Sequence, residues 1–326
     1  MWCVSDGLHL FSITFQLNSM QRIFILTPCL DAAHYIDDTI LSVIGQVGDF
    51  AIRYHVQDGG STDGTVNRLE YWARQLKTTD FPRFCRDLEF SYGSGPDEGI
   101  YDAINRGFDS HEQYMDENTM MTWINAGDRL EQGALQTVAT IRSTYPLIPW
   151  ISGGLAHINE EGSPIRYSPG GSSVSQRALA AGLYEGRRLG FLQQEGVFWT
   201  HALWKSAGSG IASGLKLAGD YQLWRQFAQY SPCFRVNTIT GIFRRHADGL
   251  SRDFQAYNDE VDLLMSGVAG QVRDDTLNEL IRLHQSDDRQ GMINTGFNGP
   301  VVIWDEKKSA WDVMASVIDP GNIVTD

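Results

Sequence analysis

Through its first half, this chain repeats one pattern: a short apolar run followed by a segment of helical periodicity. We predict strands at 22–28, 51–57, 87–92 and 120–125, and helices at 36–47, 66–76, 99–108 and 130–141. Strands joined by helices of this length need crossover connections, which place successive strands parallel in one sheet. The pattern therefore predicts an α/β fold with a mostly parallel sheet flanked by helices.

Polar residues follow each of these four strands. Thr27 and Pro28 end the first strand, Asp58 follows the second, and the segments 96–99 and 125–128 follow the third and fourth. Ligands of open α/β sheets bind at the carboxyl ends of the strands. We therefore expect these four segments to line one crevice and to form a binding site.

The second half of the chain differs in composition from the first. Residues 152–251 are rich in glycine, serine and aromatic side chains, and we expect them to complete the same domain as a second wall of the crevice. Helical periodicity returns at 254–285, and the turn residues at 298–300 before an apolar run predict a short hairpin or a capping segment. The predicted organisation is a poorly ordered extension or upstream-start artefact at 1–20, a sheet domain at 21–253, and a helical C-terminal appendage and tail at 254–326.

Composition excludes several classes of protein. The chain has 26 Lys and Arg against 40 Asp and Glu, a formal charge of −14, whereas nucleic-acid binding depends on basic residues that neutralise phosphates. No uncharged apolar run approaches the about 20 residues needed to cross a bilayer, so we expect the protein to be soluble or at most peripheral to a membrane. The four cysteines, Cys3, Cys29, Cys85 and Cys233, form no C-x-x-C pair, which favours reduced side chains in the cytoplasm.

Several motifs occur in order along residues 22–251. They are Ile-Leu-Thr-Pro at 25–28 with 35–43, Gln-Asp-Gly-Gly-Ser-Thr-Asp-Gly-Thr at 57–65, 96–107, Trp-Ile-Asn-Ala-Gly-Asp at 123–128, Gln-Gln-Glu-Gly-Val-Phe-Trp at 193–199, Leu-Ala-Gly-Asp-Tyr-Gln-Leu-Trp at 217–224, and Phe-Arg-Arg-His at 243–246 with Leu-Ser at 250–251. Together they resemble the family 2 glycosyltransferases, the inverting nucleotide-sugar enzymes of the GT-A fold, and within them the bacterial branch that builds cell-surface polysaccharides. The resemblance implies a nucleoside diphosphate sugar donor, a glycan or lipid-linked acceptor, and a place in the cytoplasm or at the inner face of the membrane.

The loop at 58–64 is the candidate nucleotide site. Its glycines allow a tight turn after the second strand, where the Asp58 carboxylate can accept hydrogen bonds from a ligand. The resemblance implies that Asp58 contacts the nucleotide base together with Thr27 and Pro28. The alternative, compatible with it, is that the side chains at 61–63 cap the following helix. The loop lacks the spacing of a phosphate-binding P-loop.

The loop after the fourth strand is the candidate metal site. Its Asn-Ala-Gly-Asp sequence at 125–128 stands where the family carries a D-x-D-like motif, and the resemblance implies that Asp128 binds Mg²⁺ or Mn²⁺ at the diphosphate. Asn125 and Gly127 leave a single carboxylate in this loop, so we expect modest metal affinity and a second ligand from elsewhere, with His246 as the candidate. The alternative is a strand-end turn that uses Gly and Asp for backbone reasons.

Three further residues are candidates for contact with the donor. The resemblance places Asp97 near it. The guanidinium groups of Arg244 and Arg245 can bind phosphate oxygens in a bidentate fork and could cover the diphosphate. The alternative for the two arginines is an ordinary solvated basic patch.

The segment 219–224 matches the family's region for the catalytic base. Inversion at an anomeric carbon needs a base opposite the leaving group, which takes the proton of the acceptor hydroxyl, and we assign this role to Asp220. An aspartate that only starts a helix would give the same sequence. Glu195 is the rival base, although its neighbours Gln193 and Gln194 suggest that all three form a hydrogen-bonding wall for sugar hydroxyls.

The aromatic residues of the second half allow two interpretations. Trp199, Trp204, Tyr221 and Trp224 could stack against sugar rings, but Trp at helical spacing is more often part of a core.

Two other functions stay open. A sugar-nucleotide nucleotidyltransferase would share the sheet and the diphosphate chemistry, but the loop at 27–34 lacks the basic residues that we expect in such an enzyme. A non-catalytic nucleotide-sugar binding module or inactive paralogue is compatible with the single carboxylate at 125–128. Nicotinamide chemistry is disfavoured, because no glycine pattern has the G-x-G-x-x-G spacing.

Overall fold

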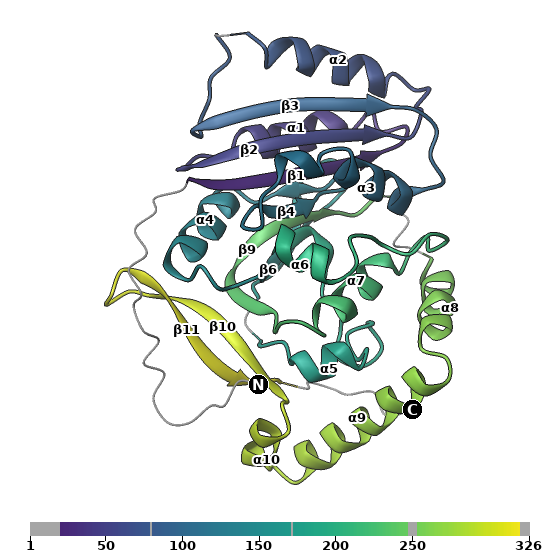
Figure 1. The fold of residues 1–326 in the computed structure, drawn as a ribbon, viewed down its shortest axis with the longest axis vertical. Helices are drawn as coiled ribbons and strands as arrows, with labels where there is room; N and C mark the ends of the chain where they lie inside the picture. The colour runs from purple at the N-terminus through teal and green to yellow at the C-terminus, as the bar shows by residue number, and fades with distance from the viewer. Residues whose placement is uncertain (1–19, 79, 171, 247–252, 320–326) are drawn as a thin grey trace.

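The computed structural model describes residues 20–78, 80–170, 172–246 and 253–319. The predicted extension at 1–20, except Met20, and the Leu-Ser pair at 250–251 lie outside the described residues. The described residues form one mixed sheet of eleven strands in the order β11-β10-β9-β6-β8-β4-β1-β2-β3, with β5 paired to β9 and β7 paired to β6 (Figure 1). No helix in this part of the chain is long and apolar enough to span a membrane.

The first half of the chain forms a parallel group of strands and the helices around it. Its elements are β1 (Gln21–Cys29), α1 (Ile36–Ile44), β2 (Phe50–Asp58), α2 (Thr65–Gln75), β3 (Asp87–Ser94), α3 (Ile100–Asp109), η1 (Glu112–Tyr114), β4 (Met120–Trp123), β5 (Arg129–Leu130) and α4 (Ala134–Thr144). β3, β2, β1 and β4 are neighbours and run parallel, as predicted. The last helix begins four residues later than predicted, because Arg129 and Leu130 pair with β9.

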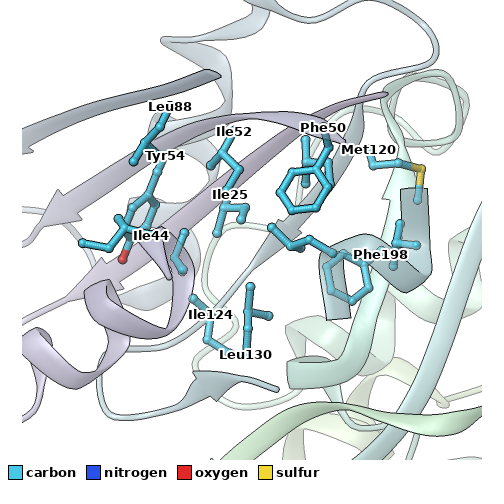
Figure 2. Packing of buried hydrophobic residues seen from close by; sticks show 14 of the residues in the cluster. Ile25, Ile44, Phe50, Ile52, Tyr54, Leu88, Met120, Ile124, Leu130 and Phe198 are labelled. Atoms are coloured by element: carbon cyan, nitrogen blue, oxygen red, sulfur yellow. The ribbon is translucent and has the colours of Figure 1, made fainter. Parts of the chain in front are cut away.

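Both faces of β1 are buried, which explains its uninterrupted apolar run. Successive side chains of a strand point to opposite faces. Ile23 and Ile25 pack into the core that contains residues of α1, α2 and α4, shown in part in Figure 2. Phe24 and Leu26 pack into the core on the other face, where the Phe24 ring lies 5.8 Å from the Phe108 ring of α3. The prediction that helices flank the sheet on both faces is therefore confirmed.

The second half of the chain extends the sheet through a reversed strand. Its elements up to residue 244 are β6 (Trp150–Ile158), β7 (Pro164–Ser168), α5 (Gln176–Ala180), η2 (Gln194–Gly196), β8 (Val197–Thr200), α6 (His201–Ser206), α7 (Gly219–Phe227) and β9 (Phe234–Arg244). β8 lies between β4 and β6 and is antiparallel to both, whereas β6 and β9 are parallel. The α/β class is confirmed, but the sheet is mixed rather than mostly parallel, since β8 runs against its neighbours.

The C-terminal segment contains strands as well as helices. Its elements are α8 (Phe254–Leu264), α9 (Val268–Gln285), α10 (Arg289–Asn294), β10 (Asn298–Asp305) and β11 (Ala310–Val317). The helical pattern predicted at 254–285 forms two helices, separated near Gly267, whose φ of 65° does not continue a helix. The predicted hairpin is confirmed as β10 and β11, and β10 also pairs with β9. The tail therefore extends the sheet, so this segment is not helical throughout, and the domain boundary at 253 stays a prediction.

The aromatic side chains of the second half form core rather than a sugar platform. Trp199, Trp204, Tyr221 and Trp224 are all buried. The Trp199 ring lies 5.7 Å from the Trp224 ring and 6.3 Å from the Trp204 ring. Rings packed in this way leave no open face for a ligand, so the interpretation as core is confirmed.

Candidate active site

The carboxyl ends of the parallel strands lie side by side, and the predicted polar segments follow them. Cys29 of β1 pairs with Asp58 of β2, and Asp58 pairs with Ser94 of β3. In the loop after β4, the main-chain N–H of Ala126 donates to the carbonyl of Pro28 at 3.4 Å. The four segments predicted to line a crevice therefore share one edge of the sheet.

The Asp58 carboxylate is enclosed by donors from its own and neighbouring loops. Its Oδ2 accepts hydrogen bonds from the N–H groups of Gly60 and Ser61, both at 3.1 Å, and from the Ser94 hydroxyl at 2.6 Å. Its Oδ1 accepts from the Ser61 hydroxyl, and the Cys29 thiol lies 3.6 Å away. Burial raises the pKa of Asp58, but these hydrogen bonds outweigh burial and hold the pKa below its ordinary value. The carboxylate thus holds the loop together, and its contact with a nucleotide base stays a prediction.

Replacement of Asp58 with Asn is expected to lower the free energy of unfolding by about 2–4 kcal/mol, because an amide nitrogen would face donors that now meet a carboxylate oxygen. Urea denaturation measures this change. Asp97→Asn is the matched control, since the partly exposed Asp97 carboxylate accepts from the Gly99 N–H at 2.9 Å, and we expect less than about 1 kcal/mol there. An Asp58→Asn protein as stable as the wild type, but with weaker nucleotide binding, would make Asp58 a ligand contact alone.

The neighbouring loop side chains also bond within the protein. Thr27 and Pro28 are buried, and the Thr27 hydroxyl shares a hydrogen bond of 2.9 Å with the Tyr54 hydroxyl. Asp63 accepts from the N–H and hydroxyl of Thr65 at 3.0 and 2.6 Å and so supports the start of α2. Both contacts are structural, and the nucleotide contacts of Thr27 and Pro28 stay predictions.

The Asp97 carboxylate lies against the Asp58 loop. A Cβ atom added to Gly59 would meet Asp97 Oδ2 at 2.7 Å, so the backbone of this loop lies directly against the Asp97 carboxylate. The structure thus brings Asp97 beside Asp58, and contact of Asp97 with a donor stays a prediction.

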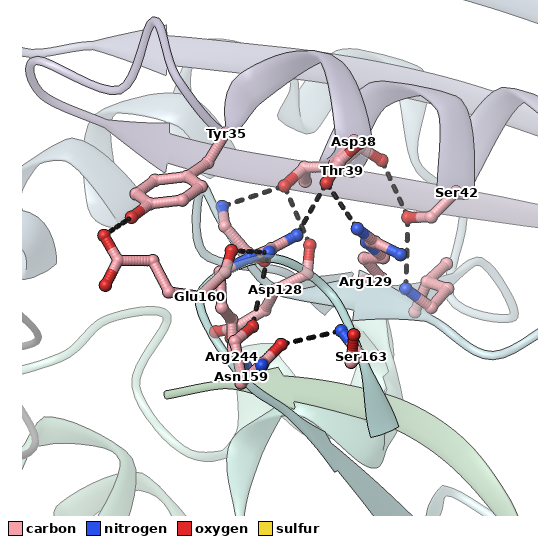
Figure 3. A network of polar contacts seen from close by, with 12 residues as sticks. Tyr35, Asp38, Thr39, Ser42, Asp128, Arg129, Asn159, Glu160, Ser163 and Arg244 are labelled. Atoms are coloured by element: carbon pink, nitrogen blue, oxygen red, sulfur yellow. Dashed lines mark hydrogen bonds and ion pairs between the residues drawn. The ribbon is translucent and has the colours of Figure 1, made fainter. Parts of the chain in front are cut away.

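The Asp128 carboxylate is held by the last residue of β9. Its Oδ1 accepts from the main-chain N–H of Arg244 at 2.8 Å, and its Oδ2 from the Asn125 amide at 3.4 Å. Asp128 is 5% exposed, and burial raises the pKa of its carboxyl to about 7 although these hydrogen bonds and the Arg244 charge lower it. The Asp128 carboxylate thus joins the loop after β4 to the end of β9 (Figure 3).

The Arg244 guanidinium supports this loop. It is 3% exposed, donates to the carbonyls of Gly127 and Glu160 at 2.9 and 2.5 Å, and pairs with Asp38 at 2.6 Å. Its central carbon lies 5.1 Å from the Tyr35 ring centroid. These contacts hold the guanidinium against its own loops, and its contact with a diphosphate stays a prediction. The sequence could not show these contacts, because Asp38 and Glu160 are far from Arg244 along the chain.

Among the described contacts, neither of the other two basic candidates makes a hydrogen bond or an ion pair with Asp128. The Arg245 side chain is exposed, and the His246 ring lies 5.3 Å from the Tyr35 ring. The described residues contain no group of three or more His, Cys, Asp or Glu side chains that could hold a metal ion. Metal ligation by His246 and diphosphate contact by Arg245 stay predictions.

The Asp128 loop still fits a divalent cation that is shared with a nucleotide. Asn125 Oδ1 is buried and has no hydrogen-bond partner among the described residues. Carboxylate and amide oxygens suit Mg²⁺ and Mn²⁺, and Mg²⁺ commonly takes one or two carboxylates together with water and substrate phosphates. One carboxylate with one amide oxygen is therefore sufficient, provided that the diphosphate supplies further ligands.

Gln194 ties η2 to the end of β4. Because β8 runs antiparallel to β4, its amino end, where η2 lies, reaches the same edge of the sheet. The Gln194 amide donates to the carbonyl of Trp123, and its Oε1 lies 3.5 Å from the Asn125 amide nitrogen. The predicted wall of η2 thus adjoins the Asp128 loop.

Glu195 interacts electrostatically with the two carboxylates assigned to catalysis and metal binding. It is 6% exposed, and its Oε2 has no hydrogen-bond partner in the described part of the chain. Burial raises the pKa of Glu195 well above its ordinary value, and the charges of Asp128 and Asp220 raise it further. The charges of Asp128 and Asp220 therefore both act on Glu195, although the three residues come from distant parts of the chain.

Asp220 lies in the first turn of α7 but is not its N-cap, which is Ala218. Its Oδ1 accepts from the N–H of Tyr221 at 2.7 Å. Burial raises the pKa of Asp220 to about 6, although the hydrogen bond from Tyr221 lowers it. The side chain is partly exposed, and with a pKa of about 6 its carboxyl group is mostly ionised at neutral pH.

Known proteins match this chain in fold but not in sequence. No family model and no curated protein matches it. S. aureus TarS 1–349 in complex with UDP-GlcNAc matches with a TM-score of 0.53 and 15% identity over 79% of this chain and 72% of that chain. The same TarS fragment in complex with UDP matches with a TM-score of 0.52 and 16% identity over 82% of this chain and 74% of that chain. The fold resembles that of glycosyltransferase structures.

Two hollows lie elsewhere on the surface. One, of about 250 Å³, lies beside α2 and β3, and the other, of about 230 Å³, lies near α10 and the end of β11. Neither is lined by a predicted site residue. The interacting carboxyl groups of Asp128, Glu195 and Asp220, rather than these hollows, therefore define the candidate active site.

Proposed function

We propose that this protein is an inverting glycosyltransferase, which moves a sugar from a nucleoside diphosphate sugar to a hydroxyl of a glycan or lipid-linked acceptor. The observation that carries the proposal is that the carboxyl groups of Asp128 and Asp220, which are distant in sequence, both act electrostatically on the buried Glu195. The fold supports it, because the matching TarS structures hold UDP-GlcNAc and UDP, which makes UDP-sugars the first donors to test.

The proposed chemistry assigns each carboxyl group a separate task. Asp220 takes the proton of the acceptor hydroxyl as its oxygen attacks the anomeric carbon, and the bond from that carbon to the diphosphate oxygen breaks. Glu195, whose pKa burial raises well above its ordinary value, donates a hydrogen bond in its protonated form to a hydroxyl of the donor sugar. Asp128 and Asn125 would hold Mg²⁺ or Mn²⁺, which neutralises the charge gathering on the departing nucleoside diphosphate.

Thermal denaturation with UDP, GDP and their sugars, with and without Mn²⁺, tests the donor. A ligand that binds the folded form at 100 times its Kd adds about 2.7 kcal/mol of stability, which corresponds to a shift of a few degrees. A radiolabelled donor then tests transfer or, without acceptor, hydrolysis. No shift with any nucleotide, together with no release of diphosphate, would contradict the proposal.

A non-catalytic nucleotide-sugar binding module is the second candidate. The observation in its favour is that Asp128 is the only carboxylate in the 125–128 loop, where the resembling family carries a D-x-D-like motif. Such a module would be stabilised by the nucleotide sugar but would release no diphosphate from it. The acceptor, and a location in the cytoplasm or at the inner face of a membrane, stay predictions.

A further inference from the structure

The segment before Asp220 is held by a carboxylate from a distant helix. Glu260 of α8 accepts hydrogen bonds from three consecutive main-chain N–H groups, those of Lys216 at 2.8 Å, Leu217 at 3.0 Å and Ala218 at 2.9 Å. Ala218 is the N-cap of α7, so its N–H is one of the donors that a helix start cannot satisfy by itself. Hydrogen bonds to a charged acceptor are stronger than neutral ones. Glu260 thus fixes the backbone directly before Asp220.

Helix α3 holds the same segment from a second direction. The Tyr101 hydroxyl donates to the carbonyl of Leu217 at 2.9 Å, and Asn105 exchanges hydrogen bonds with the main chain of Ile211 at 2.8 and 3.0 Å. A Cβ atom at Gly219 would lie 2.6 Å from the Tyr101 ring, so only glycine permits this approach. The residues before Asp220 are therefore clamped between α3 and α8.

The Asp220 side chain itself has little support. Within the described residues, the hydrogen bond that its carboxylate accepts comes from its neighbour Tyr221 at 2.7 Å. Its direction is therefore set by the backbone of the first turn of α7. A displacement of about 1 Å at a reacting group can cost about 100-fold in rate.

We propose that Glu260 is a positioning residue, which aims the Asp220 carboxylate by holding the three N–H groups at 216–218. This inference rests on the proposed function, in which Asp220 is the base. It does not make Glu260 a catalytic residue, because its carboxylate is occupied by the loop. Helix α8 lies outside the predicted sheet domain. Through Glu260, it would nevertheless affect the rate of the reaction at Asp220.

Asp262 supplies a matched control on the same helix. Its carboxylate pairs with Arg187 at 2.6 Å and lies 3.9 Å from Arg273, so it also ties α8 to its surroundings. It makes no hydrogen bond to the 216–218 segment among the described contacts. Loss of Asp262 thus tests the anchoring of α8 without removing the clamp.

The experiment compares Glu260→Ala, Glu260→Gln and Asp262→Ala in steady-state transfer and in amide hydrogen exchange. We expect Glu260→Ala to lower kcat about 10–100-fold with the donor KM unchanged, and Glu260→Gln, which keeps one acceptor oxygen, to recover part of the loss. Asp262→Ala should change kcat by less than about 2-fold. Exchange at 216–222 should be faster in Glu260→Ala and unchanged in Asp262→Ala.

The outcomes separate this inference from the proposed function. Unchanged exchange at 216–222 in Glu260→Ala overturns the clamp, whatever the activity. Equal losses of kcat in Glu260→Ala and Asp262→Ala, or a rise in donor KM that accounts for the whole loss, overturn the positioning role. A wild-type chain that neither transfers nor hydrolyses any donor ends the proposed function, and the exchange data still decide whether Glu260 holds the loop.

Discussion

Asp220→Asn should lower kcat by about 10²–10⁴-fold and leave donor affinity unchanged, because the amide keeps the shape of the side chain but cannot take a proton. Asn can still accept the hydrogen bond from the Tyr221 N–H, so the start of α7 is preserved. Steady-state transfer from a radiolabelled donor measures kcat, and calorimetric titration with UDP measures the affinity. Full turnover by this variant would remove Asp220 from the role of base.

The pH dependence of the wild-type reaction is a second test of Asp220 as the catalytic base. Burial raises the pKa of Asp220 to about 6, and the base acts only when it is ionised. Transfer should therefore be about half-maximal with respect to this group near pH 6, nearly independent of it from about one unit higher, and should fall about tenfold per pH unit well below it. Glu195→Gln is the comparison for the rival base. Since burial raises the pKa of Glu195 and so disfavours the ionised form that a base needs, this variant should lose far less turnover than Asp220→Asn.

Asp128→Asn is expected to raise the Kd for UDP in the presence of Mn²⁺ by about 10–100-fold and to leave the Kd without metal unchanged. The substitution removes the charge that a divalent cation needs, while Oδ1 can still accept from the Arg244 N–H, so the loop stays in place. Titration of the wild type and the variant with UDP, each with and without Mn²⁺, measures the effect.

The affinity for UDP with Mn²⁺ must be compared with the affinity without it to test this prediction. A wild-type protein that binds UDP equally well in both conditions would show that Asp128 holds no cation for the nucleotide. A variant that loses affinity in both conditions would indicate instead that the 125–128 loop has moved. Urea denaturation of the variant separates the second case, because a displaced loop also lowers the free energy of unfolding.

The local pattern of the sequence was sufficient for the first half of the fold. The strands predicted at 22–28 and 51–57 match β1 and β2 to within a residue at each end. β1 contains the apolar run expected of a strand buried on both faces, and β2 alternates apolar with polar residues. The helix predicted at 36–47 ends at Ile44, three residues early. These elements depend on side-chain periodicity, which a single segment carries by itself.

The local pattern of the sequence could not predict which distant segments pair in the sheet. The direction of β8 depends on its neighbours β4 and β6, and the extension of the sheet by β10 depends on β9. A four-residue strand such as β8 has no periodicity long enough to indicate either its type or its direction. The sheet is therefore mixed where a mostly parallel one was predicted, and the C-terminal segment adds two strands to the predicted helices.

The sequence by itself determined which segments reach the active edge, because polar residues after apolar runs mark the carboxyl ends of parallel strands. Only the tertiary structure decided what each side chain does there. Asp58 is enclosed by loop donors, Arg244 is bound to Asp38 and two carbonyls, and Glu260 holds the backbone before Asp220. Each of these roles depends on a partner distant in sequence, and the residue type alone is equally compatible with a ligand contact.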